Sequence, residues 1–146
     1  TARENSSRAL GIKPYSTQTE AAFLTTLNHA LDNVLNTNRR CIVQHEVSIA
    51  HVFDGNTEYS DLFYSGRFDF VVYEQEYKGT DIPILAIELD GKEHQENDIV
   101  MQRDARKNEI CRRHGFELIR VENSYARRYN YIKDILIQYF KSVKSY

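Results

Sequence analysis

The sequence predicts an α/β fold in which helices flank a central mixed sheet, with the element order α-β-β-β-α-β-α. Three observations support this prediction. Segments with apolar residues at helical spacing lie near both ends of the chain. Between them, three runs rich in β-branched and aromatic residues follow one another directly. A helical segment then leads to a fourth such run, which predicts a right-handed crossover between parallel strands.

The composition is that of one ordinary globular domain. The chain has 146 residues, of which 41% are hydrophobic and 27% charged, enough for a core of its own. We expect residues 1–15 to be a flexible arm or linker and residues 16–146 to form a single domain. The net charge of −2 argues mildly against a partner bound by bulk positive charge, although a local basic patch is compatible with it.

Targeting and redox signals are few. Cys41 and Cys111 lie far apart and form no metal or redox motif, which is typical of a reduced, cytoplasmic protein. No apolar run has the length of a membrane span, so we expect no membrane partner. Because the chain begins at Thr1 rather than Met, we expect it to be part of a larger multidomain protein or a processed chain; a homodimer is also compatible with the sequence.

The first helix is expected over residues 19–35. Thr17 and Glu20 have the spacing of a capping box, with Thr17 as the N-cap. Glu20 precedes the apolar stripe by one turn, and two roles stay open for it: completing the cap, or reaching a group of acids elsewhere in the fold. The stripe consists of Phe23, Leu24, Leu27, Leu31 and Val34.

The remaining elements follow the same rules. Strands are expected at residues 41–49, 67–73, 82–91 and 116–121, with a loop-rich segment at 50–66. Residues 97–114 should be a helix that ends before Gly115. A loop at residues 123–128 leads to the last helix, over 130–143. Its buried face is expected to contain Ile132, Ile135, Leu136, Tyr139, Phe140 and Val143.

Carboxylates interrupt the two central strands. Glu88 and Asp90 are two residues apart and share a strand face, while Asp69 shares its face with Val71 and Tyr73 and lies between Phe68 and Phe70 on the opposite side. A symmetric hairpin through the loop at 74–81 places Asp69 opposite Glu88 and diagonal to Asp90, and a β-bulge in the loop would shift this register.

Three converging carboxylates repel one another unless a proton or a cation lies between them. Oxygen ligands suit Mg²⁺ or Mn²⁺, so the pattern predicts a metal site at Asp69, Glu88 and Asp90. The alternative is that Asp69 only ends its strand and that the other two acids face solvent. Lys107 shares a helix face with Asp104, and it either pairs with Asp104 at the surface or points inward at the acids.

These residues resemble a known family. The element order, the segment Ile87-Glu88-Leu89-Asp90-Gly91 with His94, the segment from Arg103 to Lys107 and the segment from Gly115 to Arg120 are similar to the PD-(D/E)XK, or restriction-endonuclease-like, nuclease superfamily. The nearest branch is the very-short-patch-repair-endonuclease-like group and its uncharacterised bacterial relatives. The resemblance implies a restriction-endonuclease-like sandwich and a Mg²⁺- or Mn²⁺-dependent nuclease that acts most readily on DNA.

The resemblance also implies roles for residues. Glu20 would be the helix acid, and Asp69 and Glu88 the strand acids. Asp90 stands where the family has Lys, as a third metal ligand, which leaves the cationic role to Lys107. Lys92 and His94 are the next candidates for that role, and His94 is also a candidate general acid. The residues expected to contact nucleic acid are Lys92, Arg103, Arg106, Arg120, Arg127 and Arg128.

Two other functions remain open at this point. A catalytically degenerate module of the same fold would bind nucleic acid or a partner protein without cutting. A metal-dependent enzyme acting on a small phosphoester would work without regard to DNA length.

Overall fold

The structure is a computed structural model that describes residues 14–35, 39–53, 66–76, 79–91 and 97–143. The described chain divides into two compact units. Residues 35–122 contain the sheet, and the segments before residue 35 and after residue 122 form a helical unit. Pro14 and Tyr15, expected in a flexible arm, are already helical.

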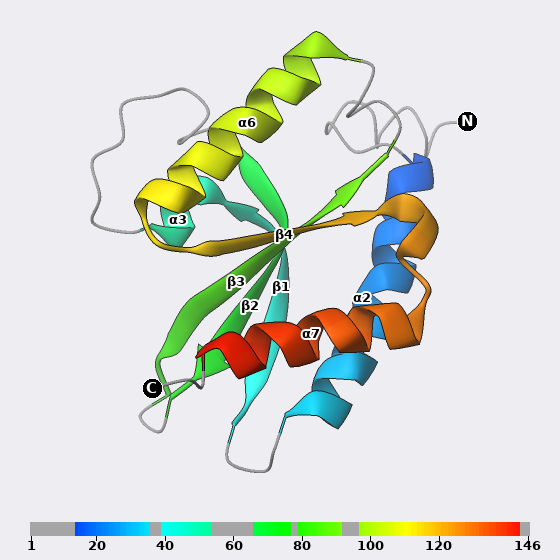
Figure 1. The fold of residues 1–146 in the computed structure, drawn as a ribbon, viewed down its shortest axis with the longest axis vertical. Helices are drawn as coiled ribbons and strands as arrows, with labels where there is room; N and C mark the ends of the chain where they lie inside the picture. The colour runs from blue at the N-terminus through cyan, green and yellow to red at the C-terminus, as the bar shows by residue number, and fades with distance from the viewer. Residues whose placement is uncertain (1–13, 36–38, 54–65, 77–78, 92–96, 144–146) are drawn as a thin grey trace. The chain divides into compact units, whose positions relative to one another are not determined.

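The first unit is built on a four-stranded mixed sheet, as predicted (Figure 1). Its strands are β1 (Cys41–Ser48), β2 (Arg67–Gln75), β3 (Asp81–Asp90) and β4 (Glu117–Glu122), in that spatial order. The first three pair antiparallel, and β4 pairs parallel to β3. The parallel pair requires a crossover connection, which α6 (Asp98–Arg113) supplies.

The predicted end of α6 before Gly115 is confirmed, and a side chain that the sequence analysis did not single out caps its start. Asn97 is the N-cap, and its side chain accepts hydrogen bonds from the backbone N–H groups of Ile99 and Val100. Gly115 follows the C-cap with a φ of 63°, the left-handed conformation that glycine adopts at little steric cost.

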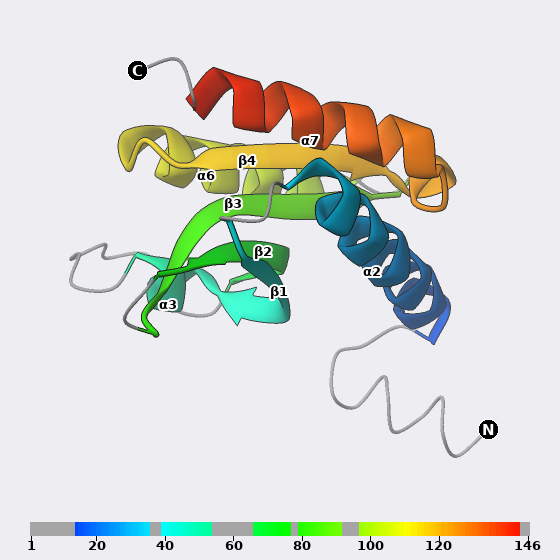
Figure 2. The same ribbon diagram turned by 90° about the horizontal axis from the view of Figure 1, so that it is seen from below.

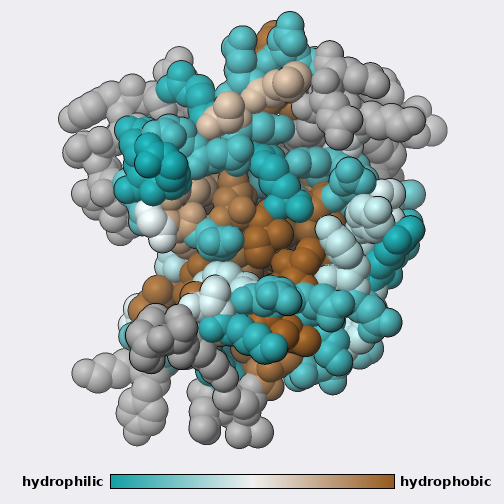
Figure 3. Space-filling view, in the orientation of Figure 1, coloured by the Kyte–Doolittle hydropathy of each residue, from teal (hydrophilic) through white to brown (hydrophobic). Residues whose placement is uncertain are grey.

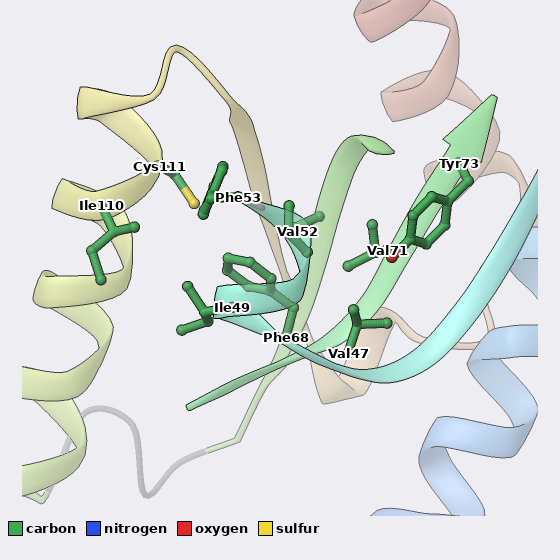
Figure 4. Close-up of a cluster of buried hydrophobic side chains, with 10 residues drawn as sticks. Val47, Ile49, Val52, Phe53, Phe68, Val71, Tyr73, Ile110 and Cys111 are labelled. Atoms are coloured by element: carbon green, nitrogen blue, oxygen red, sulfur yellow. The ribbon is translucent and has the colours of Figure 1, made fainter. Parts of the chain in front are cut away.

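One cluster of the hydrophobic core packs between the sheet, α6 and the segment after β1. Ile110 and Cys111 of α6 pack there with residues of α3 (Ile49–Val52), a short helix in the segment expected to be a loop. Figure 4 shows these side chains converging on Phe53 and Phe68. The Phe53 ring packs edge-on to both Phe68 and Phe116, in the geometry that aromatic quadrupoles favour. The core therefore holds α6 in a set position over the sheet.

The helical unit pairs α2 (Pro14–Val34) with α7 (Tyr129–Val143), joined to β4 by a short 3₁₀ segment, η1 (Asn123–Tyr125) (Figure 2). Buried residues follow the predicted apolar stripes of both helices. They are Phe23, Leu27, Ala30 and Leu31 in α2, and Ile132, Leu136 and Phe140 in α7. Among the described residues, no helix is both long and apolar enough to cross a membrane.

The predicted start of the first helix is wrong. The helix begins at Pro14, so Thr17 lies within its first turns and cannot be the N-cap of a capping box. Proline is favourable at the first helical position because its φ is already helical and its missing N–H has no helical partner there. The capping-box pattern at Thr17 and Glu20 was therefore a coincidence of spacing.

Candidate active site

The predicted register of the central hairpin is confirmed next to the acids. Phe70 pairs with Ile87, and Val72 pairs with Leu85. The register does shift, between Val72 and Tyr73, but this irregularity lies on the side of the turn. On the other side, continuing the same register brings Asp69 opposite Glu88.

At this point side chains replace backbone pairing between the two strands. The backbone N–H of Asp69 donates to Glu88 Oε2 at 2.7 Å, and the backbone N–H of Leu89 donates to Asp69 Oδ2 at 2.8 Å. Beyond Ile87, the residues of β3 continue to pair with β4. The two strands thus fork at Asp69 and Glu88, and the two carboxylates bridge the fork. Each accepts a hydrogen bond from a backbone N–H of the opposite strand.

The fork coincides with a break in the alternation of side chains. Glu46 of β1 has a φ of 55°, and the pairing of β1 with β2 passes from His45–Phe70 to Val47–Phe68 without a pair at Glu46 and Asp69. Phe68 packs in the same core cluster as Val71 and Tyr73. The predicted placement of Phe68 on the opposite face is therefore wrong. Regular pairing of β2 is interrupted at Asp69, between Phe68 and Phe70, so strict alternation does not extend across this point.

Lys107 reaches the fork from α6. Its Nζ donates to Glu88 Oε1 at 2.5 Å and to the carbonyl oxygen of Arg67 at 2.7 Å. Of the two orientations left open by the sequence, the inward one is observed. The Glu88 side chain is 3% exposed and that of Lys107 is 14% exposed, so this ion pair is largely shielded from water. Glu88 is the one charged residue among those described that is fully buried.

Asp90 is held by a different cation. Arg120 Nη1 lies 3.2 Å from Asp90 Oδ1 and 3.3 Å from Asp104 Oδ1. Arg120 also donates to the backbone oxygen of Asp104 and to the side-chain oxygen of Asn108. The guanidinium therefore joins β3, β4 and α6 next to the fork. Asp104 lies about one turn before Lys107 and Asn108 directly follows it, so this clamp also fixes the helix that carries Lys107.

The fork is rich in carboxylates. Those of Asp69, Glu88, Asp90 and Asp104 lie around two cations, Lys107 and Arg120. Carboxylate oxygens are the type of ligand that hard divalent cations prefer.

The remaining predicted residues lie in other parts of the chain. Glu20 is a partly exposed residue of α2 in the helical unit, and its link to the acids stays a prediction. Lys92 and His94 fall outside the described residues. Arg103 and Arg106 are exposed on α6, whose outward side is mostly hydrophilic (Figure 3). Arg127 and Arg128 are exposed in the helical unit.

Two cavities line the sheet unit, and neither is lined by the acids of the fork. A cavity of about 460 Å³ lies between α6 and β4, with Cys111, Phe116 and Arg120 in its wall. Another, of about 470 Å³, is lined by Glu46, His51 and Tyr73 among others.

Comparison with known proteins assigns the chain to a protein family. Residues 12–138 match the family described as "Protein of unknown function (DUF2726)". The chain is a member of DUF2726. The match includes both the fork and the helical unit of this DUF2726 chain. The comparisons with curated proteins and with solved structures give no significant match.

A thiol beside the DUF2726 fork is not a candidate nucleophile. Burial raises the pKa of Cys111 to about 12, and the negative charge of Glu88 adds to the effect. The thiolate is the reactive form, and at neutral pH it is essentially absent at Cys111. Cys111 is therefore no candidate for nucleophilic attack or for metal binding as a thiolate.

The sequence did not predict the arginine clamp. Arg120 was expected to contact nucleic acid, but its guanidinium makes the internal contacts to Asp90, Asp104 and Asn108. The i, i+4 spacing of Asp104 and Asn108 was visible in the sequence. Their common partner came from another strand, which no local spacing could identify.

Proposed function

We propose that this protein is a metal-dependent nuclease of the restriction-endonuclease-like superfamily, and that it hydrolyses phosphodiester bonds in DNA. The observation that carries the proposal is the contact of Lys107 with Glu88 at the strand fork, where Asp69 bridges to the same residue. Two acids and an ammonium group in one small region are the groups that phosphodiester hydrolysis uses.

The element order and sheet topology support this proposal. A helix, an antiparallel three-stranded meander, a crossover helix, a parallel strand and a last helix are the arrangement implied by the resemblance. Asp90 replaces the lysine of the family pattern, and Lys107 brings an ammonium group to the same acids from α6. Lys107 would thus supply, from a different element, the positive charge that the lysine of the family pattern supplies from the strand.

Asp69, Glu88 and Asp90 would hold the metal ion, since carboxylate oxygens are the ligands that Mg²⁺ and Mn²⁺ prefer. Mg²⁺ or Mn²⁺ at such a site supplies activation of water and neutralisation of charge on the phosphate. Lys107 would donate hydrogen bonds to a phosphate oxygen and stabilise the negative charge that develops there. Arg120 would keep Asp90 and α6 in position.

A specific observation also favours a second function, a degenerate module that binds nucleic acid or a protein without cutting. Both oxygens of Glu88 already have protein partners, namely Lys107 and the backbone N–H of Asp69. A carboxylate satisfied in this way can serve structure alone. The two functions differ in whether the acids are needed for cleavage.

The deciding experiment is a cleavage assay on supercoiled DNA, single-stranded DNA and a short RNA in Mg²⁺, Mn²⁺ or EDTA. We expect metal-dependent cutting of DNA by the wild type and its loss, by at least about a hundredfold, in Asp69→Asn and Glu88→Gln. Asp134→Asn, at an exposed acid of α7, is the matched control and should cut normally.

The outcomes separate the alternatives. Binding of DNA without cutting, unchanged in Asp69→Asn, would replace the nuclease by the degenerate module. Cutting that persists in both acid variants would contradict the site. Hydrolysis of a small phosphodiester that DNA fails to inhibit would favour an enzyme for small substrates.

A further inference from the structure

A column of aromatic and cationic groups lies where η1 meets α7, far along the chain from the acids. The rings of Tyr125 and Tyr131 stack with their centroids 4.8 Å apart and their planes 25° apart. The guanidinium of Arg128 lies over the Tyr125 ring, 4.4 Å from its centroid. We call Tyr125, Arg128 and Tyr131 the tyrosine platform.

The tyrosine platform is not part of the hydrophobic core. Buried positions of α7 are Ile132, Leu136 and Phe140, whereas Tyr131 is 39% exposed. It is one of only four large hydrophobic residues that are exposed in the described part of the chain. A ring that is stacked on one partner and still open to water offers an aromatic surface to a ligand.

The segment that contains the tyrosine platform has more basic than acidic residues. From Glu122 to Asp134 it contains three cations, Arg127, Arg128 and Lys133, and two acids, one at each end, although the chain as a whole carries a net charge of −2. Arg127 and Arg128 are both exposed, and the ammonium of Lys133 lies 5.9 Å from the ring centre of Tyr129. This segment therefore combines aromatic rings with cations that suit phosphates.

We propose that the tyrosine platform binds single-stranded nucleic acid by stacking an unpaired base on Tyr131. A base extends a column of stacked rings, and Arg127, Arg128 and Lys133 supply positive charge for the adjoining phosphates. Base faces are accessible in single strands and hidden by stacking in a duplex. The inference rests on the proposed function for nucleic acid as the partner, and it names unpaired strands as the substrate class.

The test is a binding titration of the whole chain in EDTA, so that cleavage plays no part. The probes are a fluorescein-labelled dT 12-mer, a 12-mer of abasic sites with the same number of phosphates, and a 12-base-pair duplex. We expect the dT 12-mer to bind about tenfold more tightly than either other probe, as one stacked base allows. Equal binding of the dT and abasic probes, or preference for the duplex, would overturn the proposal.

Three variants identify the ring. Tyr131→Leu keeps an apolar side chain without a π face and should weaken dT binding about tenfold while leaving the abasic probe unchanged. Tyr131→Phe keeps the ring and should bind within about twofold of the wild type. Met101→Ala, at a residue of α6 that is 47% exposed, controls for loss of exposed apolar surface and should change nothing. Normal dT binding by Tyr131→Leu would contradict the assignment.

The result is independent of the cleavage assay. Loss of dT binding in Tyr131→Leu, together with no cleavage by the wild type, would keep the tyrosine platform and reject the nuclease. Metal-dependent cleavage with no effect of Tyr131 on binding would keep the nuclease and reject the platform.

Discussion

Glu88 depends on its neighbours more than any other side chain of the fork. A carboxylate removed from water is unfavourable unless hydrogen bonds and an opposite charge compensate it. One oxygen of Glu88 accepts from the Lys107 ammonium and the other from a backbone N–H of β2. Stability and proposed catalysis therefore involve the same three groups: the Glu88 carboxylate, the Lys107 ammonium and the backbone N–H of Asp69.

Removing the ammonium should destabilise the protein more than removing the pair. We expect Lys107→Met to lower the free energy of unfolding by about 3–5 kcal/mol, because it leaves a buried carboxylate without its cation. The double variant Lys107→Met/Glu88→Gln should recover most of this loss. Urea unfolding monitored by circular dichroism measures both. A double variant as unstable as the single one would show that the ion pair is not the cause.

Cys41 should make stability sensitive to alkaline pH. Burial, with the charge of Glu74 adding to it, raises the pKa of this thiol from 9.0 to about 11. Between these values the unfolded state loses the proton while the folded state keeps it, so stability falls as pH rises, by at most about 1.4 kcal/mol per pH unit. Urea unfolding from pH 8 to 11 should show a smaller decline for Cys41→Ala. Parallel declines would exclude Cys41 as the source.

Among the elements, β3 is central because it changes partners along its length. Its first part pairs with β2 and its last part only with β4, and the acids lie where the change occurs. The register predicted for the acids is observed, but symmetry about the turn is not its cause. The pairs beside the turn are offset by one residue, and the register shift between Val72 and Tyr73 brings Phe70 opposite Ile87. The interruption of β2 pairing at Asp69 also has no local sequence signal, so the face of Phe68 was predicted wrongly.

The position of α6 could not be predicted from spacing alone. Helical periodicity placed Lys107 and Asp104 on one face but left two orientations open. The choice depends on how Ile110 and Cys111 pack against Phe53 and Phe68, residues from distant segments. Likewise, the predicted cap at Thr17 failed because the helix starts earlier, at Pro14. Local sequence patterns were enough to predict which segments form helices and strands. They were not enough to predict which face of α6 turns inward or where α2 begins.

The cap of α6 should support the helix that carries Lys107. Asn97 Oδ1 accepts from the N–H groups of Ile99 and Val100 at 2.9 and 3.2 Å. We expect Asn97→Ala to lower the free energy of unfolding by about 1 kcal/mol, and Asn97→Asp, which keeps the acceptor, to lower it by much less. Denaturant unfolding compares the two. If Asn97→Ala and Asn97→Asp lower the free energy of unfolding equally, the side-chain hydrogen bonds of the cap do not stabilise the helix.

For the molecule as a whole, metal binding and folding should be linked. At a Mg²⁺ or Mn²⁺ concentration ten times the dissociation constant, the gain in stability is about 1.4 kcal/mol, or roughly 4–5 °C in Tm. We expect this rise in the wild type and in Asp134→Asn, and no rise in Asp69→Asn. Differential scanning fluorimetry measures it. The same rise in Asp69→Asn would place the ion elsewhere.

The fork also gives the site a spectroscopic label of its own. The backbone amide protons of Asp69 and Leu89 are hydrogen-bonded to the side-chain oxygens of Glu88 and Asp69, respectively. Their chemical shifts and exchange rates therefore respond to whatever the carboxylates do, whether they take up a proton, bind an ion or lose Lys107. Two resonances in a backbone spectrum would thus follow the chemistry of the acids directly, with no substrate present.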